Sequence, residues 1–136
     1  MKYKTDLKKI IISKDSTINQ SLDLLDKTGR GCLLIANENG ILIGTITDGD
    51  IRRQLLEGKS INNTINGIYN EHPKHILEKF FTKEKALKII LESKINLLPI
   101  INDTGLLVNY LTIDDVLIWK KKNVGKINLP VVIMAD

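Results

Sequence analysis

Two segments of the sequence place a threonine three residues before an aspartate. Thr47 and Asp50 form the first pair, and Thr112 and Asp115 form the second. An aspartate can accept hydrogen bonds from both hydroxyls of a ribose, and a threonine hydroxyl can bond to a phosphate or a sugar. A helix follows each pair in our reading, and its free N–H groups would favour an anion such as a phosphate. The two pairs therefore suit a ligand that carries ribose and phosphate.

The same spacing is also that of an ordinary helix cap, in which the threonine side chain accepts a hydrogen bond from the first turn. The repetition favours ligand binding, although a cap would also be duplicated together with its motif. In the first segment Arg52 and Arg53 follow the aspartate, and guanidinium groups match the geometry of phosphate. Capping and ligand binding both remain open from the residues alone.

Other reactive side chains carry weaker signals. Cys32 lies in an apolar run typical of a buried strand, which favours a structural thiol. His72 and His75 have no third metal ligand spaced with them, so solvated or ligand-rim roles are favoured. The lysines after Trp119 suit the C-terminal end of a helix. The sequence has no serine–histidine–aspartate set and no phosphate-binding glycine loop, so we expect no catalytic activity from it.

The elements that must position these residues repeat along the chain. When the sequence is shifted by 65 residues, two halves align without a gap, matching Thr17 with Thr82 and Gly40 with Gly105. A repeat of this length indicates tandem duplication of one small fold. Each half is predicted to be β-α-β-β-α, with a threonine opening the first helix and an Asn/Gly turn joining two strands. The expected strands are 10–13, 32–36, 41–46, 75–77, 97–101 and 106–111, and the expected final helices are 50–57 and 114–121.

Each half alone is too small to bury enough apolar surface for stability. We therefore expect an α+β fold in which the two motifs pack sheet to sheet with pseudo-two-fold symmetry. The predicted division is a first motif over residues 1–58, a connector over 59–72, a second motif over 73–122 and a C-terminal linker over 123–136.

The composition limits the class of protein. The chain of 136 residues is 43% hydrophobic with 4% aromatic residues, which predicts an aliphatic core. Its net charge of +4 is scattered, so binding to nucleic acid is only a third, weaker interpretation, suggested by a pI near 9.1. The single cysteine excludes an internal disulfide. We find no apolar run long enough for a transmembrane helix and no signal peptide, so we expect a cytoplasmic protein without a membrane partner.

The segments around the two pairs resemble the motifs of CBS domains. Residues 44–51 read Gly-Thr-Ile-Thr-Asp-Gly-Asp-Ile, and residues 109–116 read Asn-Tyr-Leu-Thr-Ile-Asp-Asp-Val. The family pattern is glycine, two apolar residues, threonine or serine, two variable residues, aspartate and an apolar residue. Most of residues 5–120 resembles a tandem CBS pair, also called a Bateman module.

The resemblance implies an adenosine-containing ligand bound between the two motifs, with no cofactor required. AMP, ADP or ATP is expected ahead of S-adenosylmethionine. Two residues depart from the family pattern, since Thr45 stands where the family has an apolar residue and Asn109 stands where it has glycine. The Asn109 side chain occupies a place that backbone needs, so the first site is expected to be the better formed. The nucleotide-binding residues that the resemblance implies are Thr47, Asp48, Asp50, Arg52, Arg53, Thr112 and Asp115.

The resemblance extends to a larger context. Residues 47–53 resemble CBS segments attached to sugar-phosphate isomerases and to sugar-1-phosphate nucleotidyltransferases. Residues 127–135 look like the first strand of such a nucleotidyltransferase, or are a terminal strand or docking segment. We therefore expect an adenine-nucleotide-sensing regulatory module, the N-terminal part of or partner to a sugar-1-phosphate nucleotidyltransferase, that forms a homodimer through its helices. The alternative is a ligand-free dimerisation scaffold for a catalytic domain.

Overall fold

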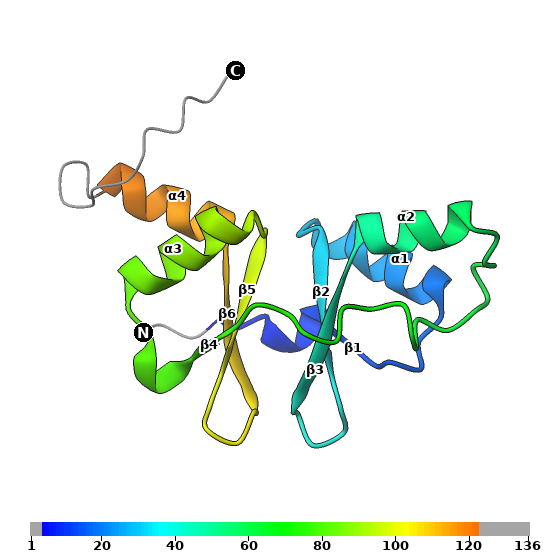
Figure 1. Ribbon diagram of the computed structural model, residues 1–136, viewed down its shortest axis with the longest axis horizontal. Helices are drawn as coiled ribbons and strands as arrows, with labels where there is room; N and C mark the ends of the chain where they lie inside the picture. Colours follow the sequence, from blue (N-terminus) through cyan, green and yellow to red (C-terminus); the bar gives the residue numbers. More distant parts are fainter. Residues whose placement is uncertain (1–3, 123–136) are drawn as a thin grey trace.

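The computed structural model describes residues 4–122, and these contain two copies of one arrangement (Figure 1). A short 3₁₀ turn, η1, opens the first copy, and η2 follows the first strand of the second. The first copy runs η1 (Leu7–Ile10), β1 (Ile11–Ile12), α1 (Ile18–Thr28), β2 (Cys32–Ala36), β3 (Leu42–Thr47) and α2 (Asp48–Leu56). The second runs β4 (Ile76–Leu77), η2 (Glu78–Phe80), α3 (Lys83–Ser93), β5 (Leu97–Ile101), β6 (Leu107–Thr112) and α4 (Ile113–Lys122). The predicted β-α-β-β-α order is confirmed in both halves.

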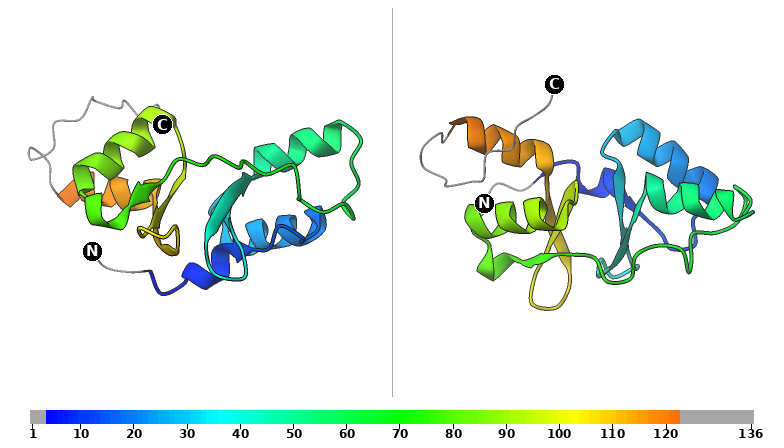
Figure 2. Two further views of the ribbon diagram at one scale, coloured as in Figure 1. Left: turned by 60° about the horizontal axis from the view of Figure 1, so that its bottom comes forward. Right: turned by 45° about the horizontal axis from the view of Figure 1, so that its top comes forward.

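Each half forms its own three-stranded sheet. In the order β1-β2-β3 the first pair is parallel and the second antiparallel, and β4-β5-β6 repeats this pattern. The two sheets stand next to each other in the middle of the molecule, and each helix pair covers the outer face of its own sheet (Figure 1). Figure 2 shows the same separation of α1 and α2 from α3 and α4 in two further views. This is the predicted α+β architecture, with motifs packed sheet to sheet.

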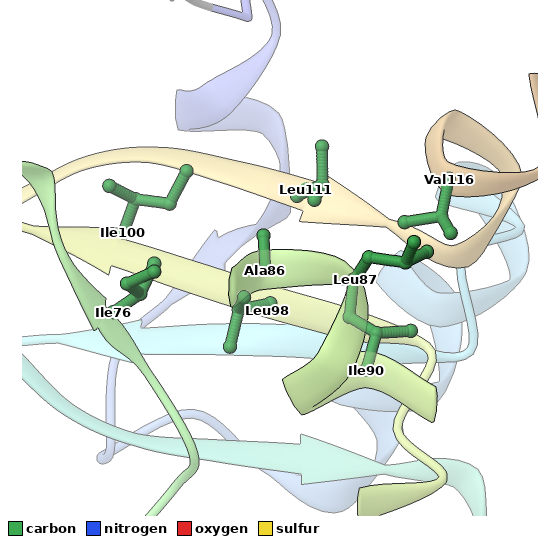
Figure 3. Close-up of a cluster of buried hydrophobic side chains, with 8 residues drawn as sticks. All are labelled: Ile76, Ala86, Leu87, Ile90, Leu98, Ile100, Leu111 and Val116. Carbon is green, nitrogen blue, oxygen red and sulfur yellow. The ribbon is translucent and has the colours of Figure 1, made fainter. Parts of the chain in front are cut away.

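The apolar runs of β2 and β5 are buried on both faces, which explains why they lack alternating polar residues. In β2, Leu33 and Ile35 pack against the first helix pair, whereas Cys32 and Leu34 face the other sheet. In β5, Leu98 and Ile100 belong to the cluster under α3 and α4, drawn in Figure 3. Successive side chains of a strand point to opposite faces, so one strand serves two cores.

The helices begin at the threonines that the sequence indicated. Thr17 and Thr82 are the N-caps of α1 and α3, and each side chain accepts a hydrogen bond from a backbone N–H three residues on. The expected final helix 50–57 is displaced, since α2 begins at Asp48 directly after its cap Thr47. The strand β3 runs into this cap and therefore ends at Thr47, one residue beyond the expectation.

The segment between the motifs contains neither helix nor strand, but it is packed. Ile65 is fully buried under α1, and its N–H donates to the Ser16 carbonyl at 2.9 Å. Asn70 exchanges two backbone hydrogen bonds with Thr45 of β3, at 2.9 and 3.1 Å. The connector is thus hydrogen-bonded to β3 at the edge of the first sheet before the chain enters β4.

Candidate functional site

Both predicted pairs lie where a strand passes into a helix, and both cap that helix. The Thr47 Oγ1 accepts the Asp50 N–H at 3.2 Å, and Asp50 Oδ2 accepts the Thr47 N–H at 3.0 Å. Thr112 and Asp115 make the same exchange at 3.2 and 2.9 Å. The capping interpretation is therefore correct for both. Capping does not exhaust a carboxylate, which has about four acceptor positions, so each aspartate can still bind a ligand.

A cleft of about 370 Å³, here called the central cleft, lies at the first pair. The first motif contributes Thr45, Thr47 and Asp50, together with the buried Cys32. The second motif contributes the turn between α3 and β5, and the connector closes a further side. The residues of these last two groups are Asn70, His72, Pro73, Lys74, Lys94, Ile95, Asn96 and Leu97. A hydroxyl and a carboxylate thus share a cleft with basic side chains from the other half of the chain.

The predicted site residues of the first motif divide into two groups. Thr47 and Asp50 line the central cleft, but Asp48, Arg52 and Arg53 are not among its lining residues. Asp48 and Arg52 are exposed on α2. Arg53 forms an ion pair with Asp50 at 2.5 Å, and could reach a ligand on that carboxylate only from the outside. Ligand contact by these three residues stays a prediction.

Cys32 cannot serve as a nucleophile at neutral pH although it lines the cleft. Burial raises the pKa of its thiol to about 12, and the negative charges of Asp50 and Asp48 add to this effect. The thiolate is the nucleophilic form, so a cysteine with this pKa is inert. The expectation of a structural thiol agrees with this environment.

The position equivalent to the central cleft in the second motif is filled by the chain itself. Tyr110 stands where the first motif has Thr45, and its ring is buried between the two sheets. Its hydroxyl donates to Asp6 at 2.6 Å, and Asp6 also pairs with Arg30 at 3.2 Å. The Lys4 ammonium pairs with Asp115 at 2.7 Å and lies 5.4 Å from the centre of the Tyr110 ring.

These contacts shift the pKa values of Asp6, Asp115 and Tyr110. The hydrogen bond from Tyr110, with the Arg30 charge, holds the pKa of Asp6 below its ordinary value despite partial burial. Burial by itself would raise the pKa of Asp115, but the hydrogen bonds from Lys4 and Thr112 outweigh it and lower that pKa. Burial and the bond to Asp6 raise the pKa of Tyr110. Asp115 is therefore a charged group that is paired with Lys4, and ligand contact by Thr112 and Asp115 stays a prediction.

A second hollow, here called the outer cleft, lies beyond Lys4 and measures about 560 Å³. Phe81, Tyr110 and Trp119 line it, and Lys83 lies 4.9 Å from the Trp119 ring centre. The outer cleft is larger than the central cleft, but Lys4 already occupies the carboxylate at its edge.

Sequence reasoning missed the residues that distinguish the two halves. Lys74 and Lys94 line the central cleft from the second motif. Lys4 and Tyr110 fill the equivalent position of the second motif. The repeat held a partial signal, because Tyr110 aligns with Thr45 and Lys94 aligns with Gly29. His72 lines the central cleft and is exposed, in agreement with a ligand-rim role.

Within residues 4–122 no helix is long and apolar enough to cross a membrane, and no group of three metal-binding side chains gathers. The predicted C-terminal linker over 123–136, with its nucleotidyltransferase-like stretch, lies outside the described residues.

Comparison with known proteins identifies the class. The CBS domain family matches residues 5–57. The fold matches CBSX2 in complex with AMP, a protein of Arabidopsis thaliana, with a TM-score of 0.70 at 21% identity over 82% of this chain and 87% of that one. It also matches the cytosolic domain of the Mg²⁺ channel MgtE in complex with ATP, with a TM-score of 0.67 at 18% identity over 81% of this chain and 44% of that one. The chain thus carries a CBS domain and has the fold of a CBS pair, as its motifs predicted.

Curated relatives point to a narrower context. The chain is 30% identical to arabinose 5-phosphate isomerase KdsD of Pseudomonas aeruginosa over 103 residues, 75% of this chain and 31% of the relative. It is 25% identical to arabinose 5-phosphate isomerase GutQ of Salmonella typhi over 97 residues, 67% of this chain and 28% of the relative. The chain spans about a third of the length of the curated relatives it matches.

Proposed function

We propose that this chain is a regulatory module that binds one adenine nucleotide, AMP, ADP or ATP, in the central cleft. The observation that carries the proposal is the composition of that cleft. Asp50 and Thr47 offer ribose and phosphate partners from the first motif, and Lys74 and Lys94 offer cations from the second. The AMP and ATP complexes of proteins with this fold support the choice of ligand. Asp115 is assigned no nucleotide, because its partner Lys4 is largely buried, whereas Arg53, the partner of Asp50, is mostly exposed and can leave that carboxylate to a ligand.

Such binding can regulate a neighbour because the cleft is built from both halves of the chain. A ligand held by both motifs favours one arrangement of the two sheets. It shifts a linked activity only if it binds the two arrangements with different affinities. No catalytic step is assigned to this chain itself.

We further propose that the regulated partner is an enzyme acting on a sugar phosphate. The similarity to two arabinose 5-phosphate isomerases supports an isomerase. The expected link to a nucleotidyltransferase depends on residues 127–135 and stays a prediction. The cytoplasm, where nucleotides and sugar phosphates are metabolised, is the proposed compartment.

A ligand-free dimerisation scaffold is the second candidate function. Leu117 and Ile118 of α4 are neighbouring large apolar side chains that are 41% and 51% exposed. These residues suit contact between two copies of the module. Homodimer formation is compatible with nucleotide binding, so the scaffold alone is favoured only if no nucleotide binds.

The proposal is tested by isothermal titration calorimetry with AMP, ADP, ATP, GTP and S-adenosylmethionine. We expect one adenine nucleotide per chain. Asp50→Asn should weaken binding by about tenfold or more, because it removes a charged acceptor while its amide oxygen can still accept the Thr47 N–H. Asp115→Asn is the matched control at the other cap and should leave binding unchanged. Absence of binding for every adenine nucleotide at millimolar concentration would overturn the proposal and favour the ligand-free dimerisation scaffold.

A further inference from the structure

Lys94, the C-cap of α3, has a backbone conformation that its side chain disfavours. Its φ is 54°, and among the described residues it is the one non-glycine residue with a positive φ. The left-handed region crowds the Cβ atom of an L-residue, and glycine is the usual residue at such a helix end. A residue in a disfavoured conformation at the rim of a cleft is a reason to look for a function.

The first motif shows that the turn itself does not need a lysine. Gly29 is the equivalent C-cap of α1, with a φ of 64° and its N–H donated to the Leu25 carbonyl. Lys94 donates its N–H to the Ile90 carbonyl in the same way. The two turns are thus built by the same hydrogen bond, and only the side chain differs. Glycine would serve equally well at position 94 as far as the fold is concerned.

The lysine side chain belongs to an exposed residue that lines the central cleft. Within residues 4–122 no carboxylate pairs with Lys94, whereas Lys4, Lys27 and Lys79 each form an ion pair. Lys74 lines the same cleft and is equally without a carboxylate partner in the described part of the chain. Two lysines that form no ion pair among the described residues line one cleft, and they provide a binding environment for an anion beside Thr47 and Asp50.

We infer that Lys94 is a specificity-determining residue of the central cleft, which binds the phosphate groups of the nucleotide and makes affinity rise with their charge. The inference rests on the proposed function and deepens it. Asp50 of the first motif binds the ribose, and Lys94 of the second motif binds the phosphates. The length of the phosphate chain therefore determines how firmly one ligand joins the two motifs.

The test is the substitution Lys94→Gly, which copies the turn of the first motif. Because the strained backbone is relieved, the thermal unfolding midpoint should stay the same or rise. The dissociation constant for ATP should increase about three- to tenfold, as for loss of one partly exposed charged contact. The constant for AMP should increase less, and that for adenosine should not change. The dependence of ATP affinity on salt should become shallower.

Lys88→Ala is the matched control, because Lys88 is an exposed lysine on the same helix and is not among the cleft-lining residues. An equal loss of ATP affinity in Lys88→Ala would overturn the inference in favour of general charge attraction. A lower unfolding midpoint in Lys94→Gly would overturn it in favour of a structural role. Unchanged ATP binding by Lys94→Gly would overturn it while leaving the proposed function intact. Failure of the unaltered chain to bind any adenine nucleotide would overturn both.

Discussion

Gly44 and Asn109 occupy the same position in the two motifs, and this single difference separates their surroundings. A Cβ atom at Gly44 would overlap the Tyr69 ring and lie 2.5 Å from the Asn70 carbonyl oxygen. The glycine therefore lets the connector pair with β3 through Thr45 and Asn70. In the second motif the Asn109 side chain takes over this role, since its Oδ1 accepts the Lys4 N–H at 3.0 Å.

We predict that Gly44→Ala destabilises the protein by about 1–3 kcal/mol, the usual cost of forcing an atom into packed surroundings. It should also weaken nucleotide binding, because the displaced connector includes Asn70 of the central cleft. Urea unfolding followed by circular dichroism measures the first effect and calorimetry the second.

Gly49→Ala is the matched control on the neighbouring helix. Gly49 has no positive φ, and the closest atom to an added Cβ is the end of the flexible Arg53 side chain at 3.4 Å. Alanine should therefore be neutral or stabilise α2 by up to about 1 kcal/mol. Equal destabilisation by both substitutions would contradict the close-approach argument.

Local spacing was sufficient to find Thr47 and Asp50, because both their capping and their place in the cleft depend on residues three positions apart. It could not find Lys4 or Asp6, whose partners Asp115 and Tyr110 are more than a hundred residues away in sequence. Lys94 is an intermediate case. Its mismatch with Gly29 was visible in the repeat, but only the fold shows that this turn lines the other motif's cleft.

At the scale of elements, the N-terminal segment is the structural counterpart of the connector. Residues 4–6 precede β1 as residues 69–71 precede β4. Each segment contacts the last strand of a sheet, which is β6 for residues 4–6 and β3 for residues 69–71. Lys4 and Asp6 make their contacts with the second motif, through Asp115 and Tyr110. The connector instead contacts β3 of the first. The segment of residues 4–6 therefore ties the first motif to the second through charge.

This tie predicts a dependence of stability on pH. The pKa values of Asp6 and Asp115 are lowered in the folded protein, from an ordinary value of 3.8. The unfolded chain then binds protons more readily, so the stabilisation is complete well above pH 3.8 and is lost as pH falls through the folded pKa values. Urea unfolding between pH 7 and about pH 3 should show this loss beginning near pH 5.

Lys4→Met should reduce the free energy of unfolding at pH 7 by about 1 kcal/mol. It should also make the loss of stability at low pH smaller, because the pKa of Asp115 is lowered less in the folded protein without the Lys4 charge. Lys8→Met is the matched control, since Lys8 is exposed and makes no ion pair within the described residues. The same change of slope in both variants would mean that total charge, rather than the Lys4–Asp115 pair, sets the acid response.

At the scale of the whole molecule, the two motifs share a core and a junction of their hairpins. Cys32 and Leu34 of the first sheet pack with Leu97, Leu107 and Tyr110 of the second. At the tips, the Leu42 N–H donates to the Gly105 carbonyl and the Leu107 N–H to the Gly40 carbonyl, at 3.1 and 2.9 Å. The small size of each half predicts that neither is stable alone, and the interface adds a second argument, since each sheet by itself would expose an apolar face.

We therefore predict that the two halves unfold together. Trp119 fluorescence reports the second motif, and reaction of the Cys32 thiol with a disulfide reagent reports opening of the interface, because the buried thiol with its pKa of about 12 is inert in the folded protein. The two signals should change at the same urea concentration.

Leu98→Ala removes a side chain from the second motif's own core and should reduce the free energy of unfolding by about 2–5 kcal/mol. If the halves are one cooperative unit, it lowers the Cys32 midpoint as much as the Trp119 midpoint. An unchanged urea midpoint for the Cys32 signal would mean that the first motif remains folded when the second unfolds. A ligand that binds both motifs would then act by bringing them together.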